Sequence, residues 1–467
     1  MSNNDIPKIV RPVTPGYIDF LKDESGCQGR ADTISFPTSY EDIRNALSYL
    51  DQIPVTVQGS RTGIKAACVP LKGHILNLSL LNTISDTKCD KGKASVRVQA
   101  GVTLEQLENA LYRQGLFWPV NPTEKSATIG GIAAKNAAGP GAYFYGPAKN
   151  HIKSLSIMDK DGNLHVINRD KVDQYIGSEG MLGIIVDIQL ALLPMPEEIW
   201  GVVIFFETNQ SALKFAHKCK DLNKTGHNLI DSTAQVVSLD YMDETCLDLI
   251  SRFLADRPGE GRLARIPQGS AIAIGMHGKS FEDMEPLLSD ITDKAAAIGA
   301  DPSNSWAFSG AGDIKQFESL RHQAMVSALF YSKKSDNETL SDSKPYFALD
   351  LEINPGFIQP VLERVTSTLS ENDLKACVFG SYGRGRFRVT LTDLNPEQYD
   401  QAEKWIDFWV TNQSNDYLIY PVYGIGKTSQ HILYSPAVKL RKEQIIDQIK
   451  LSANAHLLNP GNMNNGK

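Results

Sequence analysis

The first 195 residues alternate between short runs with strand periodicity and runs with helical periodicity. Residues 40–51 place Ile43, Leu47 and Leu50 on one helical stripe, and Ser39 precedes them as an N-cap. A helix is also expected at residues 104–114. Alternating or continuous apolar runs predict strands at residues 33–37, 54–57, 75–78, 94–99, 152–158, 164–167 and 184–193. The Asp-Gly between the fifth and sixth of these strands indicates a hairpin.

A proline-flanked break at residues 194–196 ends this region. Prolines stop strands and stiffen connections, so we expect a domain boundary there. A new α+β pattern follows, with strands expected at residues 200–206, 270–276, 346–353 and 386–392 and helices at 211–218 and 355–370. Residues 438–454 predict a final helix.

The composition is that of an ordinary globular protein, with 467 residues, 42% hydrophobic residues and a formal net charge of −7. The length predicts two or three domains. The mild acidity argues against general affinity for nucleic-acid phosphate. Neither a membrane span nor a signal peptide is apparent, so we expect a cytoplasmic protein that reaches the inner membrane only through a partner. The six cysteines form no C-x-x-C pair, which argues against a disulfide scaffold, a structural zinc site or an iron–sulfur site.

Three glycine-rich segments lie next to predicted strands, at residues 58–63, 123–146 and 177–183. Backbone amides in such loops can form concave sets of donors for phosphate oxygens. The Walker motif and the G-x-G-x-x-G fingerprint are both absent, which disfavours a P-loop and a Rossmann fold.

These segments resemble, in order and spacing, the FAD-binding PCMH-type domain of the vanillyl-alcohol oxidase and p-cresol methylhydroxylase flavoproteins. The resemblance rests on Pro-Val-Thr-Val-Gln-Gly-Ser-Arg-Thr-Gly at residues 54–63, on the long Gly- and Ala-rich loop at 119–139, and on Gly-Ser-Glu-Gly-Met-Leu-Gly-Ile-Ile at 177–185. It implies an α+β fold in which residues 1–195 form two subdomains with FAD between them. Residues 196–430 would form an α+β cap with an antiparallel sheet, and 431–467 a helical segment returning to the FAD domain.

The resemblance also assigns residues to parts of the cofactor. It places the diphosphate at Gln58, Gly59, Ser60, Arg61, Thr62 and Gly63. It places the flavin side along Pro119, Ser126, Thr128, Ile129, Gly130, Gly131, Asn136 and Gly139, and the adenine half near Glu179, Gly180 and Ile185. Some relatives tether the flavin through a histidine in the first loop. Residues 58–63 contain neither His nor Cys, so we expect non-covalent FAD.

The second half resembles, more weakly, the branch that contains D-lactate dehydrogenase, D-2-hydroxyglutarate dehydrogenase and the D-type subunit of glycolate oxidase. Many members of this branch carry an H-x-G-D-G-N-x-H motif whose two histidines hold a divalent metal. The aligned outer positions here are Ser381 and Arg388, and the third expected ligand position is Tyr423. Because these residues do not form a metal site, we expect no catalytic metal.

Arginines take the place of the missing ligands. Arg384, Arg386 and Arg388 alternate along a predicted strand, which would direct all three to one face. Guanidinium groups suit carboxylates, so one or two of them would anchor a substrate carboxylate, unless the face is simply an exposed basic surface. Tyr382 and Tyr423 are candidate hydrogen-bonding groups or, with cationic neighbours, bases; each could equally be a core aromatic. His322 and His431 are further candidate bases.

The resemblance implies an FAD-dependent dehydrogenase that oxidises a small 2-hydroxy acid such as D-lactate or glycolate. Hydride would pass to flavin N5, and electrons would continue to an electron-transfer flavoprotein, an iron–sulfur subunit or a quinone. Two alternatives stay open. One is an oxidase or dehydrogenase of another alcohol or a phenol, and the other is a non-catalytic flavin subunit of a glycolate-oxidase-like complex. Both hetero- and homo-oligomers are compatible with the sequence.

Overall fold

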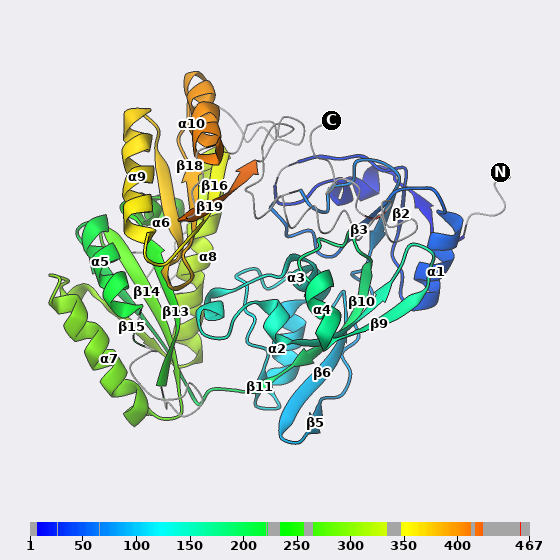
Figure 1. The fold of residues 1–467 in the computed structure, drawn as a ribbon, viewed down its shortest axis with the longest axis horizontal. Coiled ribbons are helices and arrows are strands. Elements are labelled where there is room, and N and C mark those ends of the chain that lie inside the picture. The colour runs from blue at the N-terminus through cyan, green and yellow to red at the C-terminus, as the bar shows by residue number, and fades with distance from the viewer. Residues whose placement is uncertain are drawn as a thin grey trace.

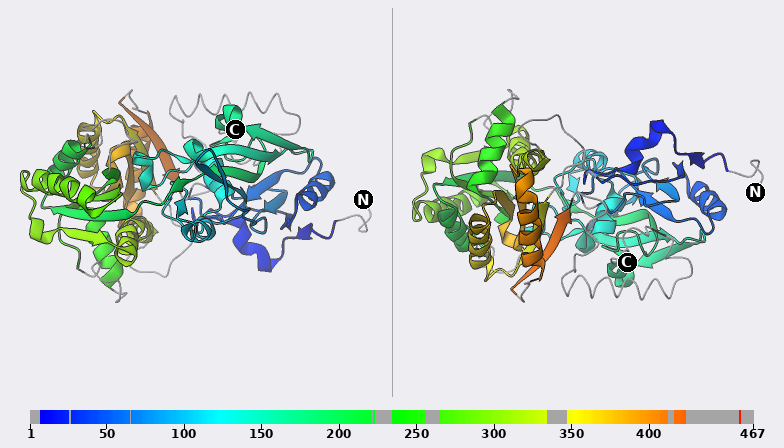
Figure 2. Two further views of the ribbon diagram at one scale, coloured as in Figure 1. Left: turned by 90° about the horizontal axis from the view of Figure 1, so that it is seen from below. Right: turned by 90° about the horizontal axis from the view of Figure 1, so that it is seen from above.

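The protein consists of two lobes with separate sheets (Figures 1 and 2). A computed structural model describes residues 7–25, 27–64, 66–220, 222, 234–255, 265–333, 347–411, 416–423 and 458. Helices and strands are mixed in both lobes, which confirms the α+β class. Within these ranges, no helix has both the length and the apolarity that crossing a membrane requires.

The first sheet of the N-terminal lobe is built around parallel strands. Its spatial order is β1 (Arg11–Pro12), β2 (Thr33–Ser35), β4 (His74–Asn77) and β3 (Val55–Gln58). Strand β4 pairs in parallel with β2 on one side and with β3 on the other. Helix α1 (Tyr40–Tyr49) begins at Ser39 with a capping box, as the sequence predicted. Short η1 (Pro15–Leu21) runs before β2.

The second sheet of this lobe is antiparallel. Its order is β5 (Lys88–Asp90), β6 (Lys93–Gln99), β10 (Ile184–Ala191), β8 (Ile152–Met158) and β9 (Leu164–Asn168). The predicted hairpin is confirmed by the β8–β9 pairing. The lobe also contains α2 (Leu104–Tyr112), α3 (Ile129–Lys135), α4 (Arg169–Tyr175), η2 (Pro140–Tyr143) and η3 (Ala148–His151). One continuous apolar core joins both sheets.

The C-terminal lobe contains a single antiparallel sheet of eight strands. Its order is β15 (Trp306–Ser309), β12 (Glu198–Phe206), β14 (Ser270–Gly278), β13 (Ala234–Met242), β17 (Ala376–Ser381), β18 (Arg386–Leu391), β16 (Phe347–Ile353) and β19 (Tyr417–Tyr423). A two-stranded ribbon, β7 (Leu116–Phe117) with β11 (Leu193–Pro194), precedes it at the predicted proline break.

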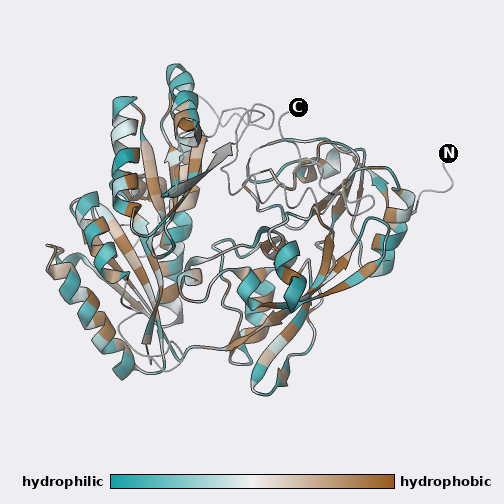
Figure 3. Ribbon diagram, in the orientation of Figure 1, coloured by the Kyte–Doolittle hydropathy of each residue, from teal (hydrophilic) through white to brown (hydrophobic). Residues whose placement is uncertain are grey.

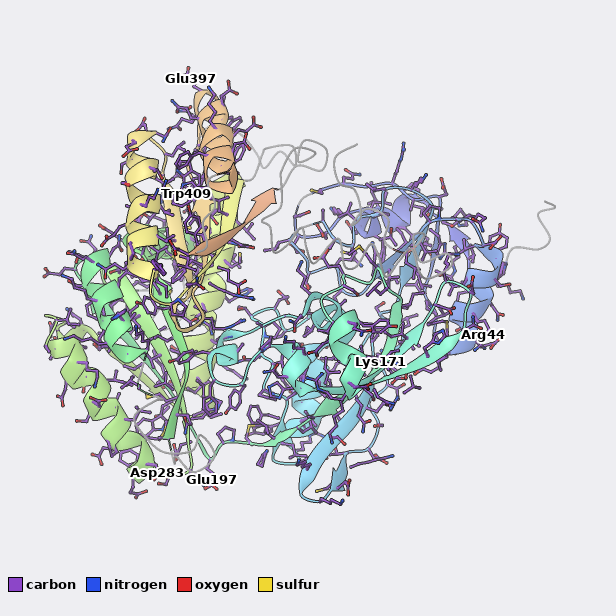
Figure 4. The ribbon with its side chains drawn as sticks, viewed as in Figure 1. Arg44, Lys171, Glu197, Asp283, Glu397 and Trp409 are labelled. Atoms are coloured by element: carbon purple, nitrogen blue, oxygen red, sulfur yellow. The ribbon has the colours of Figure 1, made fainter. Side chains whose placement is uncertain are left out.

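Helices cover the two faces of this sheet differently. One face packs on α5 (Asn209–Cys219), α7 (Phe281–Ala296), α9 (Ile358–Glu371) and α10 (Tyr399–Thr411). Figure 1 shows α5, α7 and α9 on the side away from the N-terminal lobe, and Figure 3 shows apolar residues along the strands that they cover. On α10, Trp409 (labelled in Figure 4) is fully buried and donates a hydrogen bond to Thr368 of α9.

The opposite face, which we call the inner face, packs on α6 (Glu244–Ala255) and α8 (Ala311–Lys333). Successive side chains of a strand point to opposite faces. Because Leu239 and Tyr241 belong to the core under α5 and α7, Asp240 between them lies on the inner face. The same alternation puts Asp350, Glu352, Arg386 and Arg388 on the inner face. The inner face is thus apolar under α6 and charged near β16 and β18.

Candidate functional site

The loop that follows β3 is held in an unusual backbone conformation. Gly59 packs against Thr128, the residue before α3, so closely that a Cβ on Gly59 would lie 2.2 Å from the Thr128 hydroxyl oxygen. The carbonyl of Gly59 accepts a hydrogen bond from Asn77 at 3.1 Å. Arg61 has a φ of +61°, a left-handed conformation that costs free energy for a residue with a side chain. Strain of this kind often marks a binding site.

The same loop offers unused hydrogen-bond donors. In the part of the chain that the structure describes, the backbone N–H groups of Ser60, Arg61 and Thr62 meet no acceptor. Gln58 is buried, and its amide nitrogen donates to the carbonyls of Phe20 and Cys68, each at 2.8 Å. Gln58 therefore fixes the start of the loop through its side chain. A loop with several free amides fits an anion such as a diphosphate.

The glycines at the start of α3 have a packing role as well. The N–H of Ile129 donates to Val102, and the N–H of Gly130 donates to Ala100. A Cβ on Gly130 would lie 2.7 Å from the Cβ of Ala100. Gly131 is exposed, and its N–H donates to Thr128 at 3.2 Å. The amides of these three cofactor candidates therefore donate within the protein, and their role at the cofactor stays a prediction.

The third glycine-rich segment packs on the other end of α3. The N–H of Glu179 donates to Ala134 at 3.0 Å, and its carboxylate pairs with Lys135 at 2.5 Å. Asn136 and Glu179 have φ values of +50° and +54°, and Gly180 one of +75°. Gly59 at Thr128 and Glu179 at Ala134 therefore bring the first and third segments to opposite ends of one short helix.

The remaining cofactor candidates are more dispersed. Gly139 lies against Asn121, whose carbonyl oxygen would be 2.1 Å from an added Cβ, so the two ends of the second loop meet near buried Pro119. Ser126 is exposed and donates to Glu124. Ile185 is buried within β10 and contributes to the core.

Two rows of cross-strand partners place the charges of the inner face. In the first, Glu352 lies opposite Arg386, which lies opposite Ser381, which lies opposite Asp240. In the second, Asp350 lies opposite Arg388. Arg386 contacts Glu352 at 3.0 Å, and Arg388 makes a bidentate pair with Asp350 at 2.7 and 2.9 Å. Both arginines are thus neutralised by acids of the neighbouring strand β16.

Arg384 departs from the predicted alternation. Residues Tyr382–Arg384 form the 3₁₀ turn η6, and Gly385 has a φ of +64°, so strand β18 begins only at Arg386. The expectation that all three arginines share one strand face is therefore corrected: only two do. Arg384 is half-buried and has no ion-pair partner among the described residues. Burial, and then Arg386, lower its pKa to about 10, while Glu352 opposes this shift.

Tyr382 lies on the other side of the sheet from the charged rows. It is buried in the core beside Phe387, and its hydroxyl is 3.5 Å from Nδ1 of His217. Burial raises the pKa of Tyr382, and none of the arginines lowers it. The phenol therefore stays protonated, which does not fit the expected role as a base. The side chain of Tyr423 and all of His431 lie outside the described residues. His322 lies on α8 beside Arg321.

The inner face also contains an ion pair that was not predicted from the sequence. Arg321 of α8 lies 3.2 Å from Asp240, which is 4% exposed. Burial raises the pKa of Asp240, whereas Arg321 and a hydrogen bond with Ser238 oppose this. Oxygen Oδ2 of Asp240 is the atom that lies 3.2 Å from Nε of Arg321, and this contact does not have the geometry of a hydrogen bond. The hydroxyl of Ser381, opposite Asp240, is also buried without a hydrogen bond from any described residue. The sequence signal for this ion pair was Asp240 itself, a single acidic residue in the largely apolar strand β13.

The end of the second glycine-rich loop contacts the C-terminal lobe at two places. Gly383 lies over the ring of Tyr143, which would be 2.4 Å from an added Cβ. The hydroxyl of Tyr143 donates to the carbonyl of Lys220 at 2.7 Å. The hydroxyl of Tyr145 lies 2.8 Å from Nδ1 of His277 on β14. The second glycine-rich loop therefore packs on the η6 turn, which directly precedes Arg386, at the junction of the lobes. No group of three His, Cys, Asp or Glu residues in the described ranges is placed to hold a metal ion.

Comparison with known proteins agrees with this geometry. Residues 31–168 match the FAD binding domain family. A D-lactate dehydrogenase of Anaerostipes hadrus is 26% identical over 60% of this chain, and the match covers 60% of that enzyme, less than two thirds of its length. The glycolate oxidase subunit GlcD of Bacillus subtilis is 22% identical over 93% of this chain and 89% of its own. A D-2-hydroxyglutarate dehydrogenase of Stutzerimonas stutzeri is 23% identical over 86% and 84%.

The fold is also known from a solved structure. An alkyldihydroxyacetonephosphate synthase superposes with a TM-score of 0.65 and 12% identity, over 99% of this chain and 82% of its own. At that identity the likeness concerns the fold alone. Together, the family match, the similar proteins and the convergent loops show that this chain contains an FAD binding domain, that FAD is its cofactor, and that it resembles D-lactate and D-2-hydroxyglutarate dehydrogenases and a glycolate oxidase subunit over much of its length.

Proposed function

We propose that this protein is an FAD-dependent dehydrogenase that oxidises a small 2-hydroxy acid to the 2-oxo acid. The observation that carries the proposal is the contact of the second glycine-rich loop with the turn that carries Arg384, next to the ion pairs of Arg386 and Arg388. The names of the similar proteins support the same substrate class. FAD supplies, when bound, an acceptor for a hydride equivalent.

The residues of the N-terminal lobe fit FAD. The free amides of Ser60, Arg61 and Thr62 would hold the diphosphate, and the segment at Glu179 would lie beside the adenine half. Pro119 and Gly139 would border the flavin side. Because residues 58–63 offer neither a histidine nor a cysteine, we propose that FAD is bound without a covalent link.

Asp240 is the proposed proton acceptor. Oxidation of the alcohol removes hydrogen from carbon with its electron pair and leaves a hydroxyl proton that a base must take. Asp240 is buried on the inner face and has a raised pKa, and its Oδ2 is held by the ion pair with Arg321 without accepting a hydrogen bond from the described residues. Arg321 would act as a positioning residue that holds the carboxylate in place. Roles for Arg386, Arg388 and Tyr423 at the substrate stay predictions.

Anaerobic mixing of the FAD-loaded protein with D-lactate, glycolate and D-2-hydroxyglutarate tests the proposal. At least one of these acids should bleach the oxidised flavin absorbance, with formation of the matching 2-oxo acid. If none of them reduces the flavin while dithionite does, the assignment to 2-hydroxy acids fails. Rapid reoxidation by air with peroxide formation would indicate an oxidase instead of a dehydrogenase.

A second candidate is a flavin-bearing subunit that needs a partner for turnover. It is favoured by the similarity to a protein named as a subunit, over 93% of this chain. This candidate predicts bound FAD that no substrate reduces in the isolated chain, and stable co-purification with a catalytic partner. In either case, the proposal includes a cytoplasmic location and one of three electron acceptors. These are an electron-transfer flavoprotein, an iron–sulfur subunit and a quinone.

A further inference from the structure

Three of the four guanidinium groups near the charged rows have a carboxylate of their own. Arg321 pairs with Asp240, Arg386 with Glu352 and Arg388 with Asp350. Glu318 of α8 also attracts Arg321 electrostatically. The same carboxylate is close enough to α2 to repel Glu108, which forms an ion pair with Lys125. Arg384 is the fourth, and no carboxylate in the described ranges pairs with it.

The turn that carries Arg384 is rigidly placed at the junction of the lobes. The N–H of Gly385 donates to Tyr382, and the N–H of Ile353 donates to Gly385 at 2.7 Å. An added Cβ on Gly385 would lie 2.0 Å from the carbonyl oxygen of Ile353, and Gly383 packs on Tyr143 of the N-terminal lobe. Contacts on both sides of Arg384 therefore fix its backbone beside the second glycine-rich loop.

A half-buried guanidinium without a paired carboxylate has lost part of its hydration and gains only the longer-range attraction of Glu352, which is already paired with Arg386. That loss is reflected in the pKa of Arg384, which burial lowers to about 10, so the group still carries its charge at neutral pH. An incoming carboxylate would supply the missing partner through a planar, two-point contact. Arg386 next to it is already paired with Glu352, so Arg384 is the guanidinium of this turn that remains for an incoming carboxylate.

We propose that Arg384 anchors the carboxylate of the substrate and that the site accepts a single carboxylate, so that small monocarboxylates are preferred to dicarboxylates. This inference rests on the proposed function and narrows its substrate class. A second carboxylate, such as that of 2-hydroxyglutarate, would meet guanidinium groups that Asp240, Glu352 and Asp350 already neutralise. The second carboxylate would then lose its hydration close to other acids, with no unpaired guanidinium to neutralise it.

Calorimetric titration of the FAD-loaded protein with propionate tests the anchor without any turnover. For Arg384→Gln we expect the Kd of propionate to rise roughly 10- to 100-fold, the range for loss of a charged hydrogen-bonded contact. Arg384→Lys should recover part of the affinity. Arg364→Gln is the matched control, because Arg364 is exposed on α9 and stacks over Phe408 on the opposite side of the sheet. The bound FAD content should be equal in all four proteins.

Substrate preference provides the second measurement. The wild-type protein should show a kcat/KM for D-lactate or glycolate at least tenfold above that for D-2-hydroxyglutarate. The inference is overturned if propionate does not bind the wild type, if Arg384→Gln binds it equally well, or if the dicarboxylate is the better substrate. If propionate binding depends on Arg384 but no 2-hydroxy acid reduces the flavin, the anchor stands and the proposed reaction fails.

Discussion

The hydroxyl of Tyr145 lies 2.8 Å from Nδ1 of His277, and this contact joins the second glycine-rich loop to strand β14. Both rings also pack on Phe117, which precedes that loop. Burial lowers the pKa of His277 to about 4 from its ordinary value of 6.5, so the imidazole is neutral at physiological pH. The junction of the two lobes thus depends on an uncharged histidine.

Acid should therefore weaken the protein through His277. Between pH 6.5 and about 4 the unfolded chain binds a proton at this residue and the folded chain does not, so stability falls as pH falls across that window. The slope is at most about 1.4 kcal/mol per pH unit. Thermal melts of His277→Gln should show a shallower decline than the wild type. His165→Gln, at an exposed histidine paired with Asp159, should keep the wild-type decline; equal slopes for all three would refute this role.

Gly59→Ala should expel FAD without unfolding the chain. The new Cβ would lie 2.2 Å from the Thr128 hydroxyl and would push residues 58–63, which we propose hold the diphosphate, away from α3. Purified Gly59→Ala should have at most a tenth of the wild-type flavin absorbance at an unchanged circular dichroism spectrum. Gly356→Ala is the control, because no atom lies within 4 Å of the position of its added Cβ. Full FAD content in Gly59→Ala would place the diphosphate elsewhere.

Removal of Asp350 should be much more costly than removal of Glu352. The side chain of Arg388 is 8% exposed, and Asp350→Ala would remove the carboxylate that neutralises this buried charge. We expect a loss of about 3 kcal/mol for Asp350→Ala in denaturant titrations. Glu352→Ala, which breaks the more exposed pair with Arg386, should cost less than about 1 kcal/mol. The double variant Asp350→Ala/Arg388→Met should regain much of the stability, because it also removes the buried charge. If the double variant is as unstable as Asp350→Ala, the cost does not come from the buried charge of Arg388.

Asp240→Asn should slow flavin reduction while FAD stays bound. Loss of a general base typically reduces a rate by about 10²- to 10⁴-fold. In the wild type, the rate should fall as the pH drops through the raised pKa of Asp240, and this limb of the profile should vanish in Asp240→Asn. Asp248→Asn, at an exposed position on α6, should retain both the rate and the profile. A wild-type profile in Asp240→Asn would assign the base to another residue.

Local features were predictable from the sequence because they depend on neighbouring residues. The Ser39 cap of α1 needs only residues within one helical turn, and the β8–β9 hairpin needs only its Asp-Gly turn. The alternation of Arg384, Arg386 and Arg388 was misleading because Gly385 takes a left-handed conformation that breaks the strand. Two glycines flanking Arg384 were the sequence sign of that turn.

Long-range features could not be read from periodicity. Arg321 and Asp240 are 81 residues apart, and only the packing of α8 on β13 brings them together. The tight contact of Gly130 with Ala100 is likewise a consequence of how α3 meets the end of β6. A glycine-rich segment can serve a ligand and the protein's own close packing at once, and composition does not separate the two.

Strand β3 is the outermost strand of its sheet, and on its outer edge Val55 forms a parallel bridge with Leu458. Strand β3 leads directly into the loop at Gly59, and its outer neighbour Leu458 lies about 400 residues further along the chain. On the ribosome, more than nine-tenths of the polypeptide must emerge before that edge can be sealed. A nascent chain that stalls before Leu458 would therefore leave the outer edge of β3 open, and an open strand edge can pair with another chain.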